Sequence, residues 1–347
     1  MPASALRFGV PRKGAWEDQA LAFLDECGLR VRRGSDRQLT ASVSGMPAVS
    51  VLLQRAEDVL RQVIDGKIDI GITGLDQLHE VRGEGDEVVM LHDALGFSTG
   101  DVVVAVPMSW VDVTTLADLA DVATEMRERG EQLRVATSFP SLAKRFFYDS
   151  GITHFTFVEL KGGVEAAPGV GFADIVVDIN VTGTTMRENH LKVLRNGLVM
   201  RFQACLIGNR RALGDSAGKR ELVRRILELV EARLRAQAYY SITANLRGAS
   251  EDEVALGLLR SPATRGRRGP TVARVYANAS PSTDLLAEDS AGSWYAATVI
   301  VGAGELQEAV DHLRAVGGSG ISVVPLRYLF DERSQRYEAM LAELGFK

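Results

Sequence analysis

The chain has 347 residues, which is too many for one typical core, so we expect two or three domains. Hydrophobic residues make up 46% and charged residues 24%, the balance of an ordinary globular protein. A net charge of -5 argues against nucleic acid as a partner, although a local loop can still bind an anion. The two cysteines form neither a disulfide framework nor a Cys/His metal pattern, and no apolar run is long enough to span a membrane. We therefore expect a cytoplasmic protein with reduced thiols and no membrane partner.

Short strand-like runs alternate with helical patterns in the first part of the chain, which is typical of α/β folds. Apolar runs predict strands at 6–10, 49–54, 68–73 and 101–107. Apolar residues at helical spacing predict a helix from Trp16 to Cys27 and another over 56–66.

A polar, charged stretch at about 118–133 leads into a second set of elements. The sequence predicts strands at 134–138, 155–160, 173–179, 191–200 and 204–209. Helical patterns cover 141–151, 164–171 and 186–191. The strand at 173–179 is apolar throughout, as strands inside parallel sheets are.

The last part of the chain differs in its pattern. A long helix at about 217–237 has one apolar side and one side rich in Arg and Glu. Strands at 239–246, 271–276, 294–301 and 321–326 then combine with helices at 251–259 and 305–317. This β-α-β-β-α-β order predicts a small ferredoxin-like module, with RGRRG (265–269) as a loop inside it.

The most distinctive local feature is an apolar strand, Asp174 to Asp178, followed by the turn Thr182-Gly183-Thr184-Thr185. Such a turn offers backbone N–H groups and hydroxyls to an anion, and Gly183 lets the backbone approach it closely. The residues from Thr185 to Glu188 also fit a capping box, so the threonines could simply start a helix. Asp178 could hold ribose hydroxyls or a metal, or it could be an ordinary acid at a strand end.

Six segments in the same order resemble ATP phosphoribosyltransferases. The signature-like run is VELKGGVEAAPGVGFADIVVDINVTGTTMRENHLK, at 158–192. The others are PRKGAWED (11–18), LLQRAEDVLRQVIDGKIDIGITGLDQL (52–78), LGFSTGDVVVAVP (95–107), RVATSFPSLAKRFF (134–147) and LRAVGGSGISVVPL (313–326). The likeness runs through about 1–330, and six ordered matches are more specific than any one of them.

The resemblance implies a two-lobed catalytic core of the periplasmic-binding-protein type (type II) with a C-terminal regulatory domain. One lobe would take residues 1–106 plus 190–238, and the other would take 107–189. Residues 239–347 would form a ferredoxin-like, ACT-like α+β domain. The resemblance also implies a homohexamer with histidine as feedback inhibitor.

The implied reaction is attack by N1 of ATP on the anomeric carbon of phosphoribosyl pyrophosphate, with pyrophosphate leaving. By the likeness, Thr182, Gly183, Thr184 and Thr185 would bind the 5′-phosphate of that sugar. Asp178 would face the ribose, and Glu165 would lie near the reacting centre, the two holding Mg²⁺.

The nucleotide side would be formed by Lys13, Gly14 and Arg55, with Asp76 and Lys144 as further candidates. Lys13, Arg55 and Glu165 form the implied catalytic set. Two of the nucleotide-side candidates could instead have a purely structural role. Arg55 could pair with a carboxylate of the helix that follows it, and Lys144 could belong to a solvated helix face.

Several positions depart from the family pattern. Val181 replaces the usual Ser or Gly of the phosphate loop, and Asp101 follows the L-G-F segment where a basic or neutral polar residue is more usual. The tail carries an apparent insertion at 262–270. Val181 and Asp101 keep one alternative open, a non-catalytic paralogue that regulates an active partner. A second alternative, a ligand-sensing protein, is permitted by the same two-lobed fold alone. A dinucleotide-dependent oxidoreductase is disfavoured, because no G-x-G-x-x-G turn follows the first strand.

Overall fold

The computed structural model describes residues 5–12, 14–35, 37–81, 85–158, 160, 162–276 and 293–346. By its internal contacts the chain divides into two compact units. One comprises Met1–Leu227 together with Gln335–Lys347, and the other comprises Glu228–Ser334. The segment 335–347, which we expected in the C-terminal domain, therefore groups with the first unit. It packs there because its helix is apolar on one side, with Met340 fully buried.

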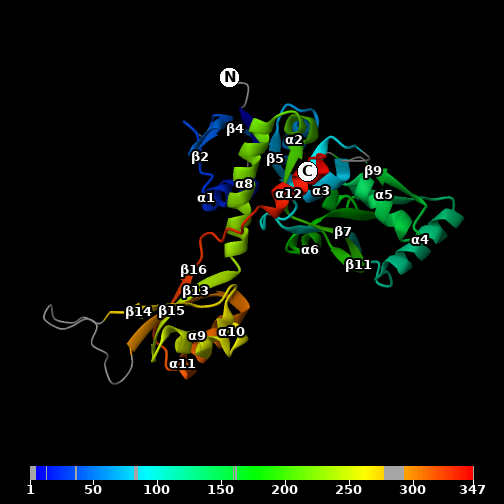
Figure 1. Ribbon diagram of the computed structural model, residues 1–347. Helices are drawn as coiled ribbons and strands as arrows, with labels where there is room; N and C mark the ends of the chain where they lie inside the picture. Colours follow the sequence, from blue (N-terminus) through cyan, green and yellow to red (C-terminus); the bar gives the residue numbers. More distant parts are fainter. Residues whose placement is uncertain are drawn as a thin grey trace. The chain divides into compact units, whose positions relative to one another are not determined.

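The first sheet of the larger unit has seven strands in the order β2-β3-β4-β1-β5-β12-β6. The strands are β1 (Leu6–Pro11), β2 (Val31–Arg32), β3 (Thr40–Val43), β4 (Met46–Gln54), β5 (Ile70–Gly74), β6 (Val88–His92) and β12 (Ala204–Asn209). β1 runs parallel to β4 and β5, whereas β12 runs antiparallel to β5 and β6. Helices α1 (Ala15–Glu26), α2 (Ala56–Ile64) and α3 (Leu75–Val81) follow β1, β4 and β5 in the chain (Figure 1).

The second sheet of this unit has five strands in the order β11-β7-β10-β8-β9. They are β7 (Gly100–Pro107), β8 (Leu133–Thr137), β9 (Phe155–Val158), β10 (Ile175–Asn180) and β11 (Leu191–Phe202). β10 is parallel to β8 and antiparallel to β7. The helices that accompany this sheet are α4 (Leu116–Glu128), α5 (Pro140–Asp149) and α6 (Thr184–Glu188).

The two sheets repeat one topology. The sheets can be written as β4-β1-β5-β12-β6 and β9-β8-β10-β7-β11. In each, the first three positions are occupied by the strands that come second, first and third along the chain among those three. The fourth position is taken by an antiparallel strand that brings the chain across from the other sheet. This is the strand order of the two lobes of type II periplasmic-binding proteins, so the predicted fold class is confirmed.

The lobe boundaries differ from the expected ones. We expected β7 and β11 in the first lobe, but both belong to the second sheet, where they pair with each other. The reason is that the sequence of a strand indicates which of its residues are buried but does not identify the strands it pairs with. β7 is apolar enough to lie inside either sheet, and its pairing with the distant β10 decides its place.

Two local predictions also changed. The polar stretch at 118–133 contains helix α4, which starts with a capping box: the Thr115 hydroxyl accepts from the Asp118 N–H and the Asp118 carboxylate accepts from the Thr115 N–H. Hydrogen bonds from the Thr114 and Thr115 N–H groups to the Asp118 carboxylate lower the pKa of Asp118 to about 2. The helix predicted at 164–171 is only a 3-10 turn, η1 (Val164–Ala166).

The smaller unit contains a four-stranded antiparallel sheet in the order β14-β15-β13-β16. Its strands are β13 (Tyr239–Gly248), β14 (Thr271–Val275), β15 (Ser293–Gly302) and β16 (Ser319–Pro325). α9 (Glu251–Leu259), α10 (Pro262–Arg265) and α11 (Leu306–Ala315) share one apolar core with this sheet. The chain order and strand order are those of a ferredoxin-like fold, as predicted. In the predicted loop, Arg267 and Arg268 pair with Asp331 and Glu332 at 3.0 and 2.9 Å.

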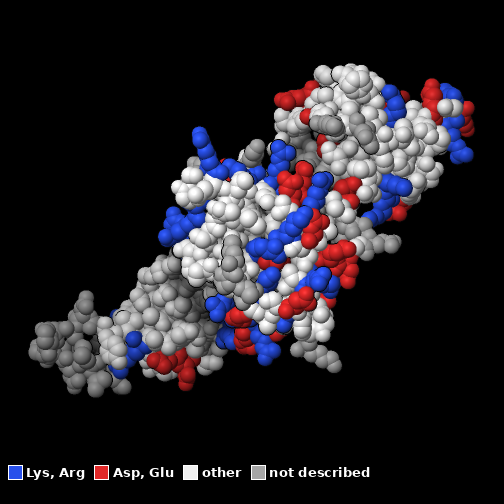
Figure 2. Space-filling view, turned by 90° about the horizontal axis from the view of Figure 1, so that it is seen from above, with Lys and Arg blue, Asp and Glu red and all other residues white. Residues whose placement is uncertain are grey.

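Charges of opposite sign are interspersed on the face that Figure 2 shows, where Lys and Arg side chains stand beside Asp and Glu. The first part of α8 (Ala217–Ala236) illustrates the mixing, because Glu221 pairs with Arg224 at 2.7 Å and with Arg225 at 3.0 Å. Among the helices of the described residues, none is both long and apolar enough to cross a membrane.

Candidate active site

A cleft of about 930 Å³ opens at the carboxyl ends of the strands in the larger unit. In open α/β sheets, ligands bind outside these strand ends, because the loops there present side chains and free backbone groups. Residues after β1, β4, β5 and β6 line one side, and Ile179, Val181 and Phe202 come from the second sheet. Both lobes therefore contribute to one cavity.

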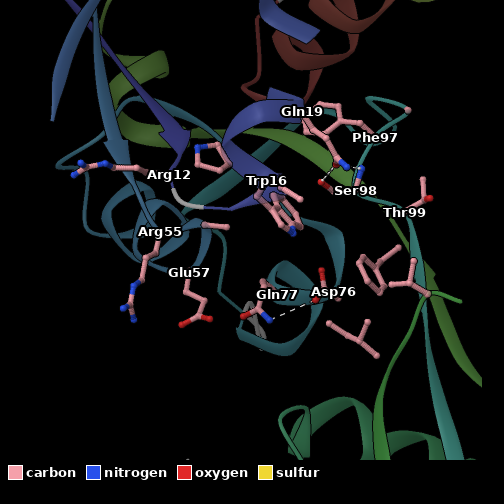
Figure 3. Close-up of a pocket in the computed structure, with 17 residues that line it drawn as sticks. Arg12, Trp16, Gln19, Arg55, Glu57, Asp76, Gln77, Phe97, Ser98 and Thr99 are labelled. Atoms are coloured by element: carbon pink, nitrogen blue, oxygen red, sulfur yellow. Dashed lines mark hydrogen bonds between the residues drawn. The ribbon is translucent and has the colours of Figure 1, made fainter. Parts of the chain in front are cut away.

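Arg12, Trp16 and Arg55 form part of the first-lobe wall. Figure 3 shows Trp16 in the middle of the cleft, with Arg12 and Arg55 on one side and Phe97, Ser98 and Thr99 on the other. Arg55 lies directly after β4, with extended backbone as the N-cap of α2, and is exposed. No carboxylate in the described part of the chain lies within ion-pair distance of Arg55. Its guanidinium thus remains available to an anionic ligand.

Asp76 lies in the same wall and is only 3% exposed. Its Oδ2 accepts a long hydrogen bond of 3.4 Å from Gln77, while Oδ1 has no hydrogen-bond partner among the described residues. Burial raises the pKa of Asp76, and the nearby charge of Glu57 adds to the rise. Gly74 is required beneath this carboxylate, because a Cβ there would come within 2.2 Å of Oδ1.

The hydroxyl-rich turn follows β10, next to the cleft-lining Val181. Gly183 takes a positive φ of 74°, which glycine adopts at little cost, and it is the N-cap of α6. The Thr182 hydroxyl lies 3.1 Å from that of Thr184 and accepts from the Thr184 N–H at 3.4 Å. Within the described residues, the N–H of Thr185 has no acceptor.

The capping-box alternative is not what the structure contains. α6 starts two residues earlier than that pattern requires, and its N-cap, Gly183, has no side chain to accept a bond. Thr182, Thr184 and Thr185 are all exposed. The turn therefore presents hydroxyls and at least one unpaired amide outward, as an anion site needs.

Two carboxylates of the second lobe, Asp178 and Glu165, influence each other electrostatically. Asp178 is half-buried near the end of β10, and burial raises its pKa. The negative charge of Glu165, in the turn η1, raises it further. Mg²⁺ is commonly held by one or two carboxylates plus substrate phosphates, and a cation would relieve this repulsion. The pair fits such an ion, although no cluster of three metal-binding side chains occurs among the described residues.

The remaining candidates lie less centrally. Lys13 is outside the described residues. Gly14 is the exposed N-cap of α1, with a positive φ of 63° and open space around it. Lys144 is on the exposed face of α5, where its Nζ lies 5.9 Å from the centre of the Tyr148 ring and not in the cleft lining. Asp101 lies 3.9 Å from Arg201 in a solvent-exposed pair.

The sequence reasoning missed several residues of the cleft. Trp16 was assigned to the buried face of its helix, yet it is half-buried and lines the cavity. Gln19, Phe97 and Ser98 were not candidates at all, and they line it too. An available signal was position: Trp16 follows the carboxyl end of β1 within one turn of helix, where ligand-binding side chains of α/β proteins gather.

Comparison with known protein families decides the identity. A family model described as ATP phosphoribosyltransferase matches residues 55–232. The chain belongs to the ATP phosphoribosyltransferase family. A second model, described as HisG, C-terminal domain, matches residues 236–328. The chain is accordingly a long-form ATP phosphoribosyltransferase, an enzyme that transfers a phosphoribosyl group to ATP in the first step of histidine biosynthesis.

Relatives match nearly the whole chain. The chain is 36% identical over 342 residues to ATP phosphoribosyltransferase 2, chloroplastic, of Arabidopsis thaliana, covering 98% of this chain and 81% of that protein. It is 34% identical over 341 residues to the ATP phosphoribosyltransferase of Bradyrhizobium sp. (strain ORS 278), covering 98% of each. A solved structure, the ATP phosphoribosyl transferase (HisG:HisZ) complex from Thermotoga maritima, includes a chain that is 26% identical, with a TM-score of 0.49. The match covers 65% of this chain and 96% of that one.

Proposed function

We propose that the cleft binds ATP against the first lobe while the turn at 182–185 holds the 5′-phosphate of phosphoribosyl pyrophosphate. The observation that carries this assignment is the position of Val181, the residue before the turn, in the lining of the same cleft as Arg55. A sugar held at the turn would therefore have its anomeric carbon near a purine in the cleft.

The phosphate contacts follow from the turn itself. The hydroxyls of Thr182, Thr184 and Thr185 and the amide of Thr185 are donors that have, among the described residues, no stronger partner than one another. Hydrogen bonds to a charged acceptor are about twice as strong as neutral ones. Val181 adds no hydroxyl, so the backbone and the threonines provide the donors.

The nucleotide contacts come from the opposite wall. The Trp16 ring offers an apolar face for a purine, and Arg55 offers a bidentate donor to phosphate oxygens. Asp76 lines this wall as a buried acceptor. We assign Lys13 and Gly14, which follow β1 in the chain, to the phosphate side of the nucleotide, and Lys144 remains a weaker candidate for it.

Glu165 and Asp178 would hold Mg²⁺ together with oxygens of the sugar pyrophosphate. The ion supplies charge neutralisation to the leaving pyrophosphate. The same carboxylates would stabilise electrostatically the positive charge that develops on the ribose.

Alignment of the two substrates accounts for much of the proposed rate. N1 of adenine is a poor nucleophile, and no covalent enzyme intermediate is needed. Holding two reactants in a reactive geometry can contribute roughly 7–11 kcal/mol. A cleft between two lobes can also close over both substrates, exclude water and limit hydrolysis.

The smaller unit is the proposed site of regulation. Its ferredoxin-like fold is separate from the cleft in sequence, and we propose that histidine binds to it and inhibits the homohexamer. Such inhibition requires histidine to bind two states of the enzyme unequally. A histidine titration of the reaction rate, with sedimentation measured in parallel, tests both statements.

The assay for the site follows product formation by absorbance with ATP, phosphoribosyl pyrophosphate and Mg²⁺. We expect turnover to collapse in the Thr184→Ala and Glu165→Ala variants. Thr124→Ala is the matched control, because Thr124 is exposed, does not line the cleft and donates its hydroxyl hydrogen to the Ala120 carbonyl of its own helix. Unchanged turnover in Thr184→Ala and Glu165→Ala would reject the assignment of these residues, and absence of turnover in the unmodified chain would favour the non-catalytic alternative.

A further inference from the structure

The C-terminal helix α12 (Gln335–Glu343) lies beyond the residues that the family's C-terminal domain model matches, which end at 328. It nevertheless belongs to the larger unit, where it packs against β6. Met340, on its inner face, is fully buried. The helix is therefore an integrated part of the catalytic core.

Polar contacts fix α12 at both ends. At its start, Arg336 Nη2 donates to Asp93 Oδ1. At its end, Arg210 donates to the Glu343 carbonyl at 2.7 Å and to its carboxylate at 2.9 Å. Just beyond, the Arg220 guanidinium lies 4.1 Å from the centre of the Phe346 ring. The start of the helix is thus tied to the residue that follows β6.

That residue, Asp93, begins the connection from β6 to β7, and the last four residues of this connection before β7, residues 96–99, line the substrate cleft. Backbone N–H groups in the connection are individually held: Leu95 donates to the Ala204 carbonyl at 3.0 Å, and Gly96 donates to Gln203 Oε1 at 2.9 Å. We name residues 93–99 the wall loop.

The wall loop contains a strained residue. Ser98 has a positive φ of 49°, which is uncommon for any residue other than glycine. It is held there by Gln19, whose Oε1 accepts from the Ser98 N–H at 3.0 Å and from its hydroxyl at 2.6 Å (Figure 3). A strained residue persists only when its surroundings over-determine it, so the loop depends on its anchors.

His92 also holds the start of the loop. His92 Nδ1 accepts a hydrogen bond of 3.2 Å from the Ala94 N–H, which requires that nitrogen to be unprotonated. Burial and then Arg336 lower the pKa of His92 to about 4, while Asp93 opposes them. The imidazole is therefore neutral at neutral pH, so Nδ1 stays available to accept from the Ala94 N–H.

We propose that α12 braces the wall of the substrate cleft, with Arg336 acting as a positioning residue that holds the wall loop through Asp93. Arg336 does not touch the cleft, so its effect on nucleotide binding passes through the loop. This statement rests on the proposed function in one respect, that the cleft binds ATP.

The test combines hydrogen exchange with kinetics in the full-length chain. In Arg336→Ala we expect faster amide exchange in the peptide covering the wall loop, measured without substrate. We expect KM for ATP to rise about tenfold, the factor that corresponds to about 1.4 kcal/mol of binding free energy, with kcat nearly unchanged. Arg336→Lys should restore much of both, because it keeps the charge. Asp93→Asn, which removes the charge but keeps an acceptor oxygen for Arg336, should reproduce part of the effect of Arg336→Ala.

Arg211→Ala is the matched control. Arg211 pairs with Asp215 at 3.6 Å, is 91% exposed and does not line the substrate cleft, so neither readout should change. Unchanged exchange of the wall loop in both Arg336→Ala and Asp93→Asn would overturn the bracing role and leave the assignment of the cleft untouched. Faster exchange with unchanged KM for ATP would overturn the link to binding and would also count against ATP in this cleft.

Discussion

Gly74→Ala adds one methyl group beneath the carboxylate of Asp76. The ideal Cβ would lie 2.2 Å from Asp76 Oδ1 and 3.4 Å from the edge of the Trp16 ring. Non-bonded heavy atoms need roughly 3.5 Å, so the carboxylate must move by about 1 Å or more. Asp76 is 3% exposed, and its other oxygen is bonded to Gln77, so this movement disturbs the wall of the cleft.

The structure sets the expected size of two effects. Overpacking a well-packed site costs about 1–3 kcal/mol, so the free energy of unfolding should fall by about that amount. A misplacement of about 1 Å at a reacting site can cost about a hundredfold in rate. We therefore expect kcat/KM for ATP to fall by about a hundredfold, which corresponds to about 2.7 kcal/mol of transition-state stabilisation.

The assay measures kcat/KM for ATP alongside urea unfolding. Gly214→Ala is the control, since a Cβ at Gly214 meets nothing within 4 Å. A folded Gly74→Ala variant with the kcat/KM of the unmodified chain would refute the reasoning, because it would show that the position of Asp76 does not matter to the nucleotide. Loss of kcat/KM in the Gly214→Ala control would refute it equally.

Two further predictions concern the charged groups of the site. Burial and Glu165 raise the pKa of Asp178, so the ionised carboxylate destabilises the folded state, and the free energy of unfolding falls as pH rises through the range in which Asp178 ionises. Asp178→Asn should therefore be at least as stable as the unmodified chain at pH 7 by urea unfolding, and its advantage should shrink toward pH 4. Turnover of the variant should fall sharply. A variant that is clearly less stable at pH 7 would mean that the ionised carboxylate has partners that stabilise it. Arg55 is exposed and forms no ion pair within the described part of the chain. Arg55→Ala should therefore change the free energy of unfolding by no more than about 0.5 kcal/mol while raising KM for ATP. Arg55→Lys should restore only part of the ATP binding that the alanine variant loses. A KM for ATP that is unchanged in Arg55→Ala would remove this residue from the site.

Local pattern was enough for most elements of the fold. The apolar runs at 68–73 and 173–179 correspond to β5 and β10, and the helical spacing at 56–66 corresponds to α2. These elements follow from burial periodicity, which neighbouring residues carry. The likeness to a family then supplied the two-lobed arrangement that periodicity alone does not contain.

Long-range pairing was beyond the reach of the sequence. Val103 of β7 lies opposite both Asp178 and Leu198, which are far along the chain. Nothing in the sequence of β7 predicts these pairing partners. The return of α12 to the larger unit has the same cause, since its contacts involve residues more than a hundred positions away. Ser98 gave no signal either, because a positive φ is expected of glycine and not of serine.

The candidate site was only partly visible for a related reason. Thr182 to Thr185 and Asp178 are contiguous with a strong strand pattern, so they could be singled out. Trp16 could not, because an aromatic residue at helical spacing usually marks a core position. Its place in the cleft depends on how α1 meets the other strand ends, which is a tertiary property.

The most direct test is a crystal structure of the full-length chain with phosphoribosyl pyrophosphate and Mg²⁺. The account predicts that the 5′-phosphate accepts hydrogen bonds from the hydroxyls of Thr184 and Thr185 and from the Thr185 amide, with the anomeric carbon directed toward Trp16 and Arg55. A sugar phosphate bound elsewhere, with the turn at 182–185 making no contact to it, would contradict the account.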